Sequence, residues 1–256
     1  MRKIWAFAGR ELGGGFHSTI GSGVGTVFLL VAGFFFRTHV LFFHFQSFQA
    51  GVRPPGAEPL RISDGIIRPF LGSLGFLVLL VLPFLTMRLF SEERRSGSLE
   101  LLLSYPVRPF EAVLGKFLGA LLFYAILLLA SLALPAFLFF VSEPDLGALL
   151  CGYAGLLLLG ASFLSLGLLA SSLTSSPAVA ASGAFGFFLV AWAVGWTASV
   201  SGPRAAEALE AVSFLHRYAR FGAGIVDAGD ALFFIAWIVY PLVLAARVVG
   251  SGRRRA

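Results

Sequence analysis

The residues best placed to do chemistry lie in one stretch between two apolar runs. Five charged side chains gather there: Glu92, Glu93, Arg94, Arg95 and Glu100. Ser91 can cap a helix at this point, and Glu92 and Arg95 have the i,i+3 spacing of an ion pair. We therefore expect residues 88–116 to form a compact amphipathic hairpin that packs residues 99–103 on the protein and turns its charges outward. The chemistry indicated is docking of a partner; an ordinary solvated loop is the alternative.

No nucleotide-binding loop accompanies these charges. A phosphate-binding loop needs the spacing Gly-x-x-x-x-Gly-Lys-Ser/Thr. Here Gly115-Lys116 is followed by Phe117, and no glycine stands at the required upstream position. We therefore expect this chain to bind no nucleotide cofactor and to have no catalytic residues of its own.

Histidines and aspartates near the ends of apolar runs are the other candidates. His39, His44 and His216 do not have the spacing of metal ligands, and the single cysteine, Cys151, cannot complete a set. We expect interfacial histidines and no metal site, with a metal-handling role as the alternative. Asp227 and Asp230 come just before the last apolar run, where they are expected to cap a helix.

The composition indicates that these residues are carried by a membrane protein. Only 12% of residues are charged, against about 25% in a typical soluble protein, and the mean hydropathy is +0.89. A membrane span needs roughly 20 apolar residues. Six stretches meet this need: 19–36, 70–87, 117–141, 147–170, 178–200 and 229–246. The first five contain no charge, which disfavours an ion-coupled carrier or an intramembrane protease.

The basic residues predict the orientation of these spans. An even number of spans places both termini on one side, and cytoplasmic segments carry an excess of Lys and Arg. With cytoplasmic termini, the inner segments hold 12 of the 19 basic residues: Arg2, Lys3, Arg10, Arg88, Arg94, Arg95, Arg108, Lys116, Arg247, Arg253, Arg254 and Arg255. Because the basic residues cluster at span ends, we read them as topology signals and not as a nucleic-acid surface.

Several short motifs, taken in order, resemble those of the ABC-2 type permeases, in particular the branch associated with gliding motility and nitrous-oxide-reductase maturation. They comprise Arg10-Glu11-Leu12, Leu82-Pro83, Met87 to Phe90, Glu92 to Arg94, Gly97 to Leu103, Gly115 to Leu118, Pro144-Asp145, Gly152-Tyr153, Ala170 to Thr174, and Gly224 to Asp227 with Asp230. The resemblance covers nearly the whole chain. Two departures are Ser98, where the family has threonine, and Gly13-Gly14-Gly15, which loosens the end of the first helix.

The resemblance assigns roles to the charged residues. It implies a coupling helix that contacts a separate ATP-binding subunit through Glu92, Glu93, Arg94, Arg95, Gly97 and Glu100. It implies an interfacial connecting helix that carries Arg10 and Glu11, and a second cytoplasmic contact at Ser172, Thr174 and Ser175. ATP and Mg would be held by the partner subunit.

The expected fold is therefore an all-α integral membrane domain over residues 1–256, with six spans, a cytoplasmic coupling-helix hairpin and an N-terminal connecting helix. The resemblance implies an exporter permease in the bacterial cytoplasmic membrane, paired with an ATP-binding subunit and a second permease copy or a related permease. An extracytoplasmic accessory protein is a further partner to consider, and the substrate stays open. The alternatives are a non-transporting scaffold driven by an ATPase, and an ATP-independent channel or carrier.

Overall fold

The computed structural model describes residues 2–50, 61–98, 108–140, 144–200 and 202–252. Within these residues the chain forms helices and no strands. The helices are α1 (Arg2–His17), α2 (Thr19–Ala50), η1 (Ser63–Ile67), α3 (Arg68–Thr86), α4 (Ser91–Arg95), α6 (Pro109–Ala136), η2 (Phe137–Phe140), α7 (Leu146–Leu173), α8 (Pro177–Val200), α9 (Pro203–Val212), α10 (Phe214–Gly222) and α11 (Ala228–Gly252). The expected all-α fold is confirmed.

Six helical stretches are long and apolar enough to cross a membrane. They are Thr19–Phe48, Ser63–Arg95, Pro109–Phe140, Leu146–Leu173, Pro177–Thr197 and Ala228–Ser251. The expected spans match these stretches in number and order. The first is longer than the 19–36 expected, because the helix continues past Arg37, whose exposed side chain can reach the headgroup layer from a helix surface.

Helix α7 lies at the centre of the bundle. It packs against α3, α6, α8, α10 and α11. Small residues allow this close approach: Ser162 and Ser165 donate hydrogen bonds to the carbonyls of Phe234 and Trp237 on α11, at 3.2 and 2.8 Å. Because lipid provides no hydrophobic force between helices, such close packing and interhelical hydrogen bonds hold the bundle together.

The peripheral helices present apolar faces outward. On α2, Leu30, Phe34 and Phe45 are each more than 60% exposed, and on α8 Val190 is 66% exposed. Exposed apolar side chains over the length of a helix suit contact with hydrocarbon. The outer helices are therefore built for a lipid environment and the inner helix for protein contact.

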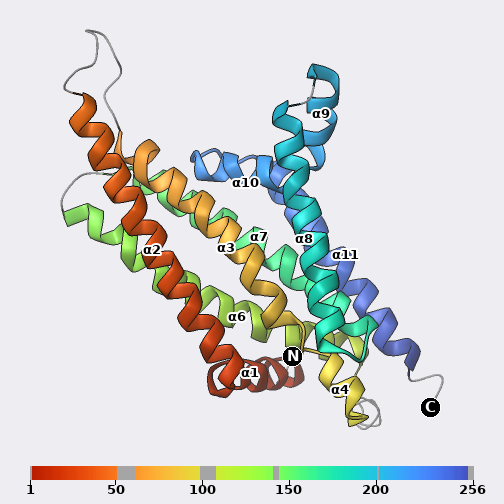
Figure 1. Cartoon of the computed structure of the whole chain (residues 1–256). Coiled ribbons are helices and arrows are strands. Elements are labelled where there is room, and N and C mark those ends of the chain that lie inside the picture. Colours follow the sequence, from red (N-terminus) through yellow and green to blue (C-terminus); the bar gives the residue numbers. More distant parts are fainter. Residues whose placement is uncertain (1, 51–60, 99–107, 141–143, 201, 253–256) are drawn as a thin grey trace.

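The two ends of the bundle differ. At one end, α1 lies across the bundle close to the short helix α4, and α11 ends there (Figure 1). At the other end, α10 lies across the bundle and α9 extends beyond α8 (Figure 1). We refer to these as the α4 end and the α10 end. Between α8 and α11, the fifth and sixth spans, the chain forms α9 and α10.

Candidate coupling site

Helix α4 is held in place by the end of α7. The hydroxyl oxygen of Ser171 accepts hydrogen bonds from the backbone amides of Phe90 and Ser91 at 3.0 and 3.1 Å, and the same hydroxyl donates to the carbonyl of Met87 at 3.1 Å. The expectation that Ser91 caps this helix was wrong. Phe90 is the capping residue, and the Ser91 hydroxyl instead donates to the Met87 carbonyl.

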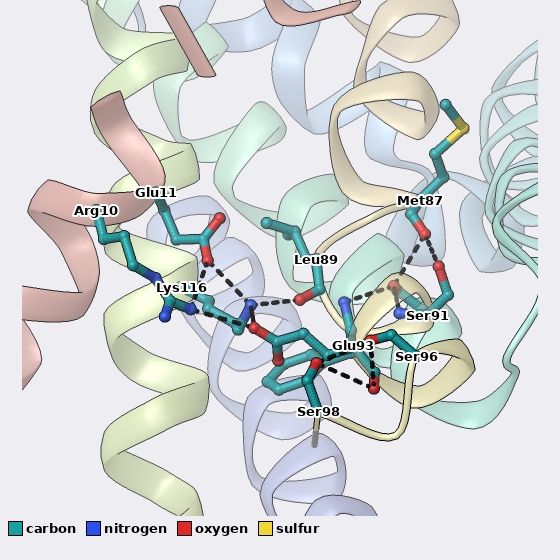
Figure 2. A network of polar contacts seen from close by, with 11 residues as sticks. Arg10, Glu11, Met87, Leu89, Ser91, Glu93, Ser96, Ser98 and Lys116 are labelled. Carbon is teal, nitrogen blue, oxygen red and sulfur yellow. Dashed lines mark hydrogen bonds and ion pairs between the residues drawn. The ribbon is translucent and has the colours of Figure 1, made fainter. Parts of the chain in front are cut away.

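A buried lysine joins three elements next to α4. The Nζ atom of Lys116, on α6, lies 2.9 Å from Oε1 of Glu11 on α1 and 2.9 Å from Oε1 of Glu93 on α4. It also donates to the carbonyl of Leu89 at 2.6 Å, and it lies 5.0 Å from the centre of the Phe90 ring. Figure 2 shows these contacts converging on one ammonium group. The Lys116 side chain is only 2% exposed.

A second cation completes the charge balance. Nη2 of Arg10 lies 3.2 Å from Oε1 of Glu93 and 3.7 Å from Oε1 of Glu11. Two carboxylates and two cations therefore compensate one another, as burial of charge requires. We call Arg10, Glu11, Glu93 and Lys116 the charge latch. Lys116 was counted above among the topology signals, and its place in the latch is a further role that the sequence did not predict.

Helix α1 reaches the latch because two glycines on α6 let it dock closely. A Cβ atom at Gly119 would lie 2.6 Å from Cβ of Glu11 and 2.8 Å from the carbonyl oxygen of Ala8. A Cβ atom at Gly115 would lie 2.5 Å from Cβ of Phe7. The glycine triplet at 13–15 does not end the helix early, since α1 continues to His17.

The charges of α4 divide between an inner and an outer side. Glu93 turns inward to the latch, so the expectation that all of Glu92 to Arg95 face outward is corrected. Glu92 pairs with Arg88 at 2.9 Å, one turn earlier, and not with Arg95 as its spacing suggested. Arg95 is exposed, while Arg94 is half-buried and approaches the carbonyl of Leu173 at 3.5 Å.

The helix ends at a glycine that permits a sharp turn. Gly97 has φ of 71°, a left-handed conformation that favours glycine. On either side of it in the sequence, the hydroxyls of Ser96 and Ser98 lie 2.8 Å apart and both donate to the carbonyl of Glu93. Glu100, expected in the same contact, lies outside the described residues.

The second expected contact lies beside the first. Ser175 is exposed, Thr174 is half-buried and accepts a hydrogen bond from the Ser176 amide at 3.1 Å, and Ser172 is buried and donates to the carbonyl of Leu169 at 2.7 Å. The neighbouring serine, Ser171, makes the link to α4. Two adjacent serines at a helix end do not show which of them faces a neighbour, so only the structure identifies it.

A second charged cluster lies at the α10 end. Asp230, 1% exposed, lies 2.8 Å from Arg217 and 3.1 Å from Arg220, and Arg217 stacks on the Phe233 ring. Asp227 accepts from the Gly229 amide at 2.8 Å, as its expected capping role requires. That bond and the nearby Arg220 guanidinium hold the pKa of Asp227 below its ordinary value. Asp230 does not cap the helix; it binds α10 to α11.

The histidines lie in separate environments. His39 is 2.9 Å from the Ser73 hydroxyl, and His216 is 3.8 Å from Glu210. Among the residues that the structure describes, no group of three or more His, Cys, Asp or Glu side chains is placed to hold a metal ion.

Comparison with known proteins identifies the family. The family model described as ABC-2 family transporter protein matches residues 41–213, which include α4, Lys116 and the end of α7. A search of curated proteins finds no match. Since the family model covers more than half of the sequence, this chain belongs to the ABC-2 transporter family.

Proposed function

We propose that this chain is the permease subunit of an ATP-driven exporter of the bacterial cytoplasmic membrane, and that a separate ATP-binding subunit docks on α4. The observation that carries the proposal is the charge latch, in which Lys116 joins α1, α4 and the α6 span at one buried point. ATP and Mg would be bound by the partner. The branch linked to gliding motility and nitrous-oxide-reductase maturation is our proposal for its nearest relatives, supported by the sequence motifs alone.

The latch supports coupling because it makes α4 part of the bundle. A short helix on a flexible loop would absorb a push from a partner by bending. Here Ser171 fixes the start of α4 to α7, and Glu93 fixes its middle to α6 and α1. A displacement of α4 would therefore move three spanning or connecting elements together, as a rigid-body transition requires.

The surface left for the partner is the outward side of α4 and the neighbouring turn. Arg95 and Gly97 are exposed, and the Glu92 side chain is 49% exposed. Ser175 lies in the turn between α7 and α8, and both α7 and α8 contact α4. We propose that these residues contact the ATP-binding subunit. Glu93 and Lys116 would not contact it, but would hold α4 against α6 and α1.

Cysteine cross-linking tests this proposal. In a Cys151→Ala background, Arg95→Cys is expected to form a cross-link with a co-expressed ATP-binding subunit of the same organism. Glu207→Cys, on exposed α9 at the opposite end, is the matched control and should form none. A cross-link from Glu207→Cys with none from Arg95→Cys would refute the docking surface.

Reconstitution in vesicles separates the proposed exporter from the two alternatives. An exporter moves solute only while the ATP-binding subunit hydrolyses ATP. A scaffold would show ATP turnover at the complex without solute movement. A channel or carrier would move solute with no ATPase present, and that result would contradict the proposal.

A further inference from the structure

A charged cavity lies beside the latch at the α4 end. Its volume is about 260 Å³, and it is lined by the α1–α2 junction, the end of α3, α4 and α6. The charged residues of its lining are Glu11, Arg88, Glu92, Glu93 and Lys116. Its remaining lining is largely apolar and glycine-rich, with Ile20, Phe84 and Phe123 on the side that faces the spans.

An apolar groove adjoins this cavity. The groove runs between α2 and α3, has a volume of about 420 Å³, and is lined by side chains such as Val24, Leu80 and Val81. Ile20 and Phe84 line both hollows, so the charged cavity opens toward the groove. Gly23 also lines the groove, and a Cβ atom there would meet nothing within 4 Å.

The dimensions of the groove correspond to one leaflet of a bilayer. Its lining on α2 runs from Thr19 to Val31, a helix length of about 18 Å at 1.5 Å per residue. Half of a hydrocarbon core is about 15 Å thick. One acyl chain lying along α2 would thus fill the groove while its headgroup occupied the charged cavity.

We infer that this pair of hollows binds one phospholipid with a zwitterionic headgroup carrying a primary amine, drawn from the leaflet at the α4 end. Lys116 already has three acceptors and stays in the latch. Arg88 and Glu92 form an exposed pair, with side chains 43% and 49% exposed. Since exposed ion pairs contribute little, this pair can separate, Arg88 binding the phosphate and Glu92 the ammonium group.

Photolabelling of the purified permease alone tests the acyl-chain half of the inference. The probe is a phosphatidylethanolamine with a photoactivatable group in one acyl chain, present at trace level in lipid nanodiscs. We expect adducts on the groove residues of α2 and α3, reduced several-fold by Gly23→Phe. Gly33→Phe is the matched control, since Gly33 lies on the same helix with open space at its Cβ but outside the groove, and it should leave labelling unchanged.

The headgroup half is tested with two variants that break the same ion pair. Arg88→Gln removes the phosphate partner and should lower labelling by probes with phosphatidylethanolamine and phosphatidylglycerol heads alike. Glu92→Gln keeps Arg88 and should abolish only the preference for the ethanolamine head. Equal labelling by both probes in the wild type would refute the zwitterion assignment.

Two results would overturn the site as a whole. One is labelling spread evenly over lipid-facing residues such as Leu129 and Leu232, which would indicate ordinary bilayer contact. The other is a disulfide between two copies carrying Val27→Cys, which would show that a second copy covers the groove. Because no ATP-binding subunit is present in these experiments, their outcome is independent of the proposed function.

Discussion

At the scale of single residues, Lys116 is the side chain on which the α4 end depends most. Moving an ammonium group out of water costs several kcal/mol, and the cost is recovered only where good geometry supplies paired charges and hydrogen bonds. Lys116 has both, with two carboxylate oxygens at 2.9 Å and one carbonyl at 2.6 Å. Lys116 is buried because α1 and α4 both pack against α6 around it. Its Nζ atom therefore contacts carboxylates on both helices.

Removing this ammonium group should destabilise the protein strongly. Lys116→Met leaves Glu11 and Glu93 facing one another with a single exposed arginine between them, and removing one partner of a buried pair costs about 3–5 kcal/mol. Thermal unfolding in mild detergent, followed by size-exclusion chromatography, measures the effect.

The control for this variant breaks an exposed ion pair at the same end. Arg88→Gln removes the Arg88–Glu92 bridge, and the expected cost is about 1 kcal/mol or less. If Lys116→Met unfolded at the same temperature as Arg88→Gln, the charge latch would not contribute to the stability of the fold.

Asp227 provides a pH-dependent contribution at the opposite end. Its pKa is held below the ordinary value of 3.8 first by the hydrogen bond from the Gly229 amide and then by Arg220. A carboxyl with a depressed pKa stabilises the fold above its ordinary pKa, and this stabilisation is lost as the pH falls toward and through the folded-state value. Asp227→Asn should therefore be less stable than wild type at neutral pH and equal to it in strong acid. Unfolding midpoints measured across this pH range check the expectation, and a difference that persisted in acid would contradict it.

At the scale of elements, the docking of α1 on α6 decides whether the latch can form. Glu11 reaches Lys116 only because Gly115 and Gly119 present no side chain to α1. Gly119→Ala places a Cβ atom 2.6 Å from Cβ of Glu11, well inside contact distance, so α1 must move away. We expect lower thermal stability and loss of a cross-link between cysteines placed at Phe16 and Phe123, whose rings lie 4.8 Å apart between α1 and α6.

Gly9→Ala is the matched control for this substitution. Gly9 is exposed on α1, and a Cβ atom there meets nothing within 4 Å. Alanine is favoured over glycine within a helix by about 0.5–1 kcal/mol, so this variant should be as stable as wild type or more so. Equal behaviour of the two alanine variants would show that α1 is not docked as described.

The spanning helices can be predicted from the sequence, but only some of the contacts between them can. Long apolar runs define the spans, because crossing hydrocarbon demands length and hydropathy that a single sequence displays. The spacing of Gly115 and Gly119 indicates close packing but not that α1 is the partner. The inward turn of Glu93 and the choice of Ser171 over Ser172 depend on helix rotation. The rotation of a helix about its axis depends on contacts with residues distant in sequence. It therefore cannot be predicted from the local sequence pattern.

At the scale of the whole molecule, the two ends of the bundle carry different kinds of structure, and a direction across the membrane follows. The start of α1 and the end of α11 lie at the α4 end, and α9 lies at the α10 end (Figure 1). The α4 end also carries the charge latch, and the α10 end carries the Asp230 cluster. An even number of spans and the cluster of basic residues near α1, α4 and the end of α11 predict that the α4 end faces the cytoplasm.

A labelling experiment on intact spheroplasts tests this orientation, on which the docking proposal rests. In a Cys151→Ala background, a membrane-impermeant maleimide should label Glu207→Cys in α9 and should not label Arg95→Cys or Ser251→Cys until the membrane is opened. All three positions are exposed on the protein surface. A difference in labelling between them therefore reports the side of the membrane on which each lies. The reverse pattern would place α4 outside the cell, where no nucleotide-hydrolysing partner could reach it. Labelling of Arg95→Cys and Ser251→Cys from opposite sides would instead contradict the count of six spans, because both lie at the same end of the bundle.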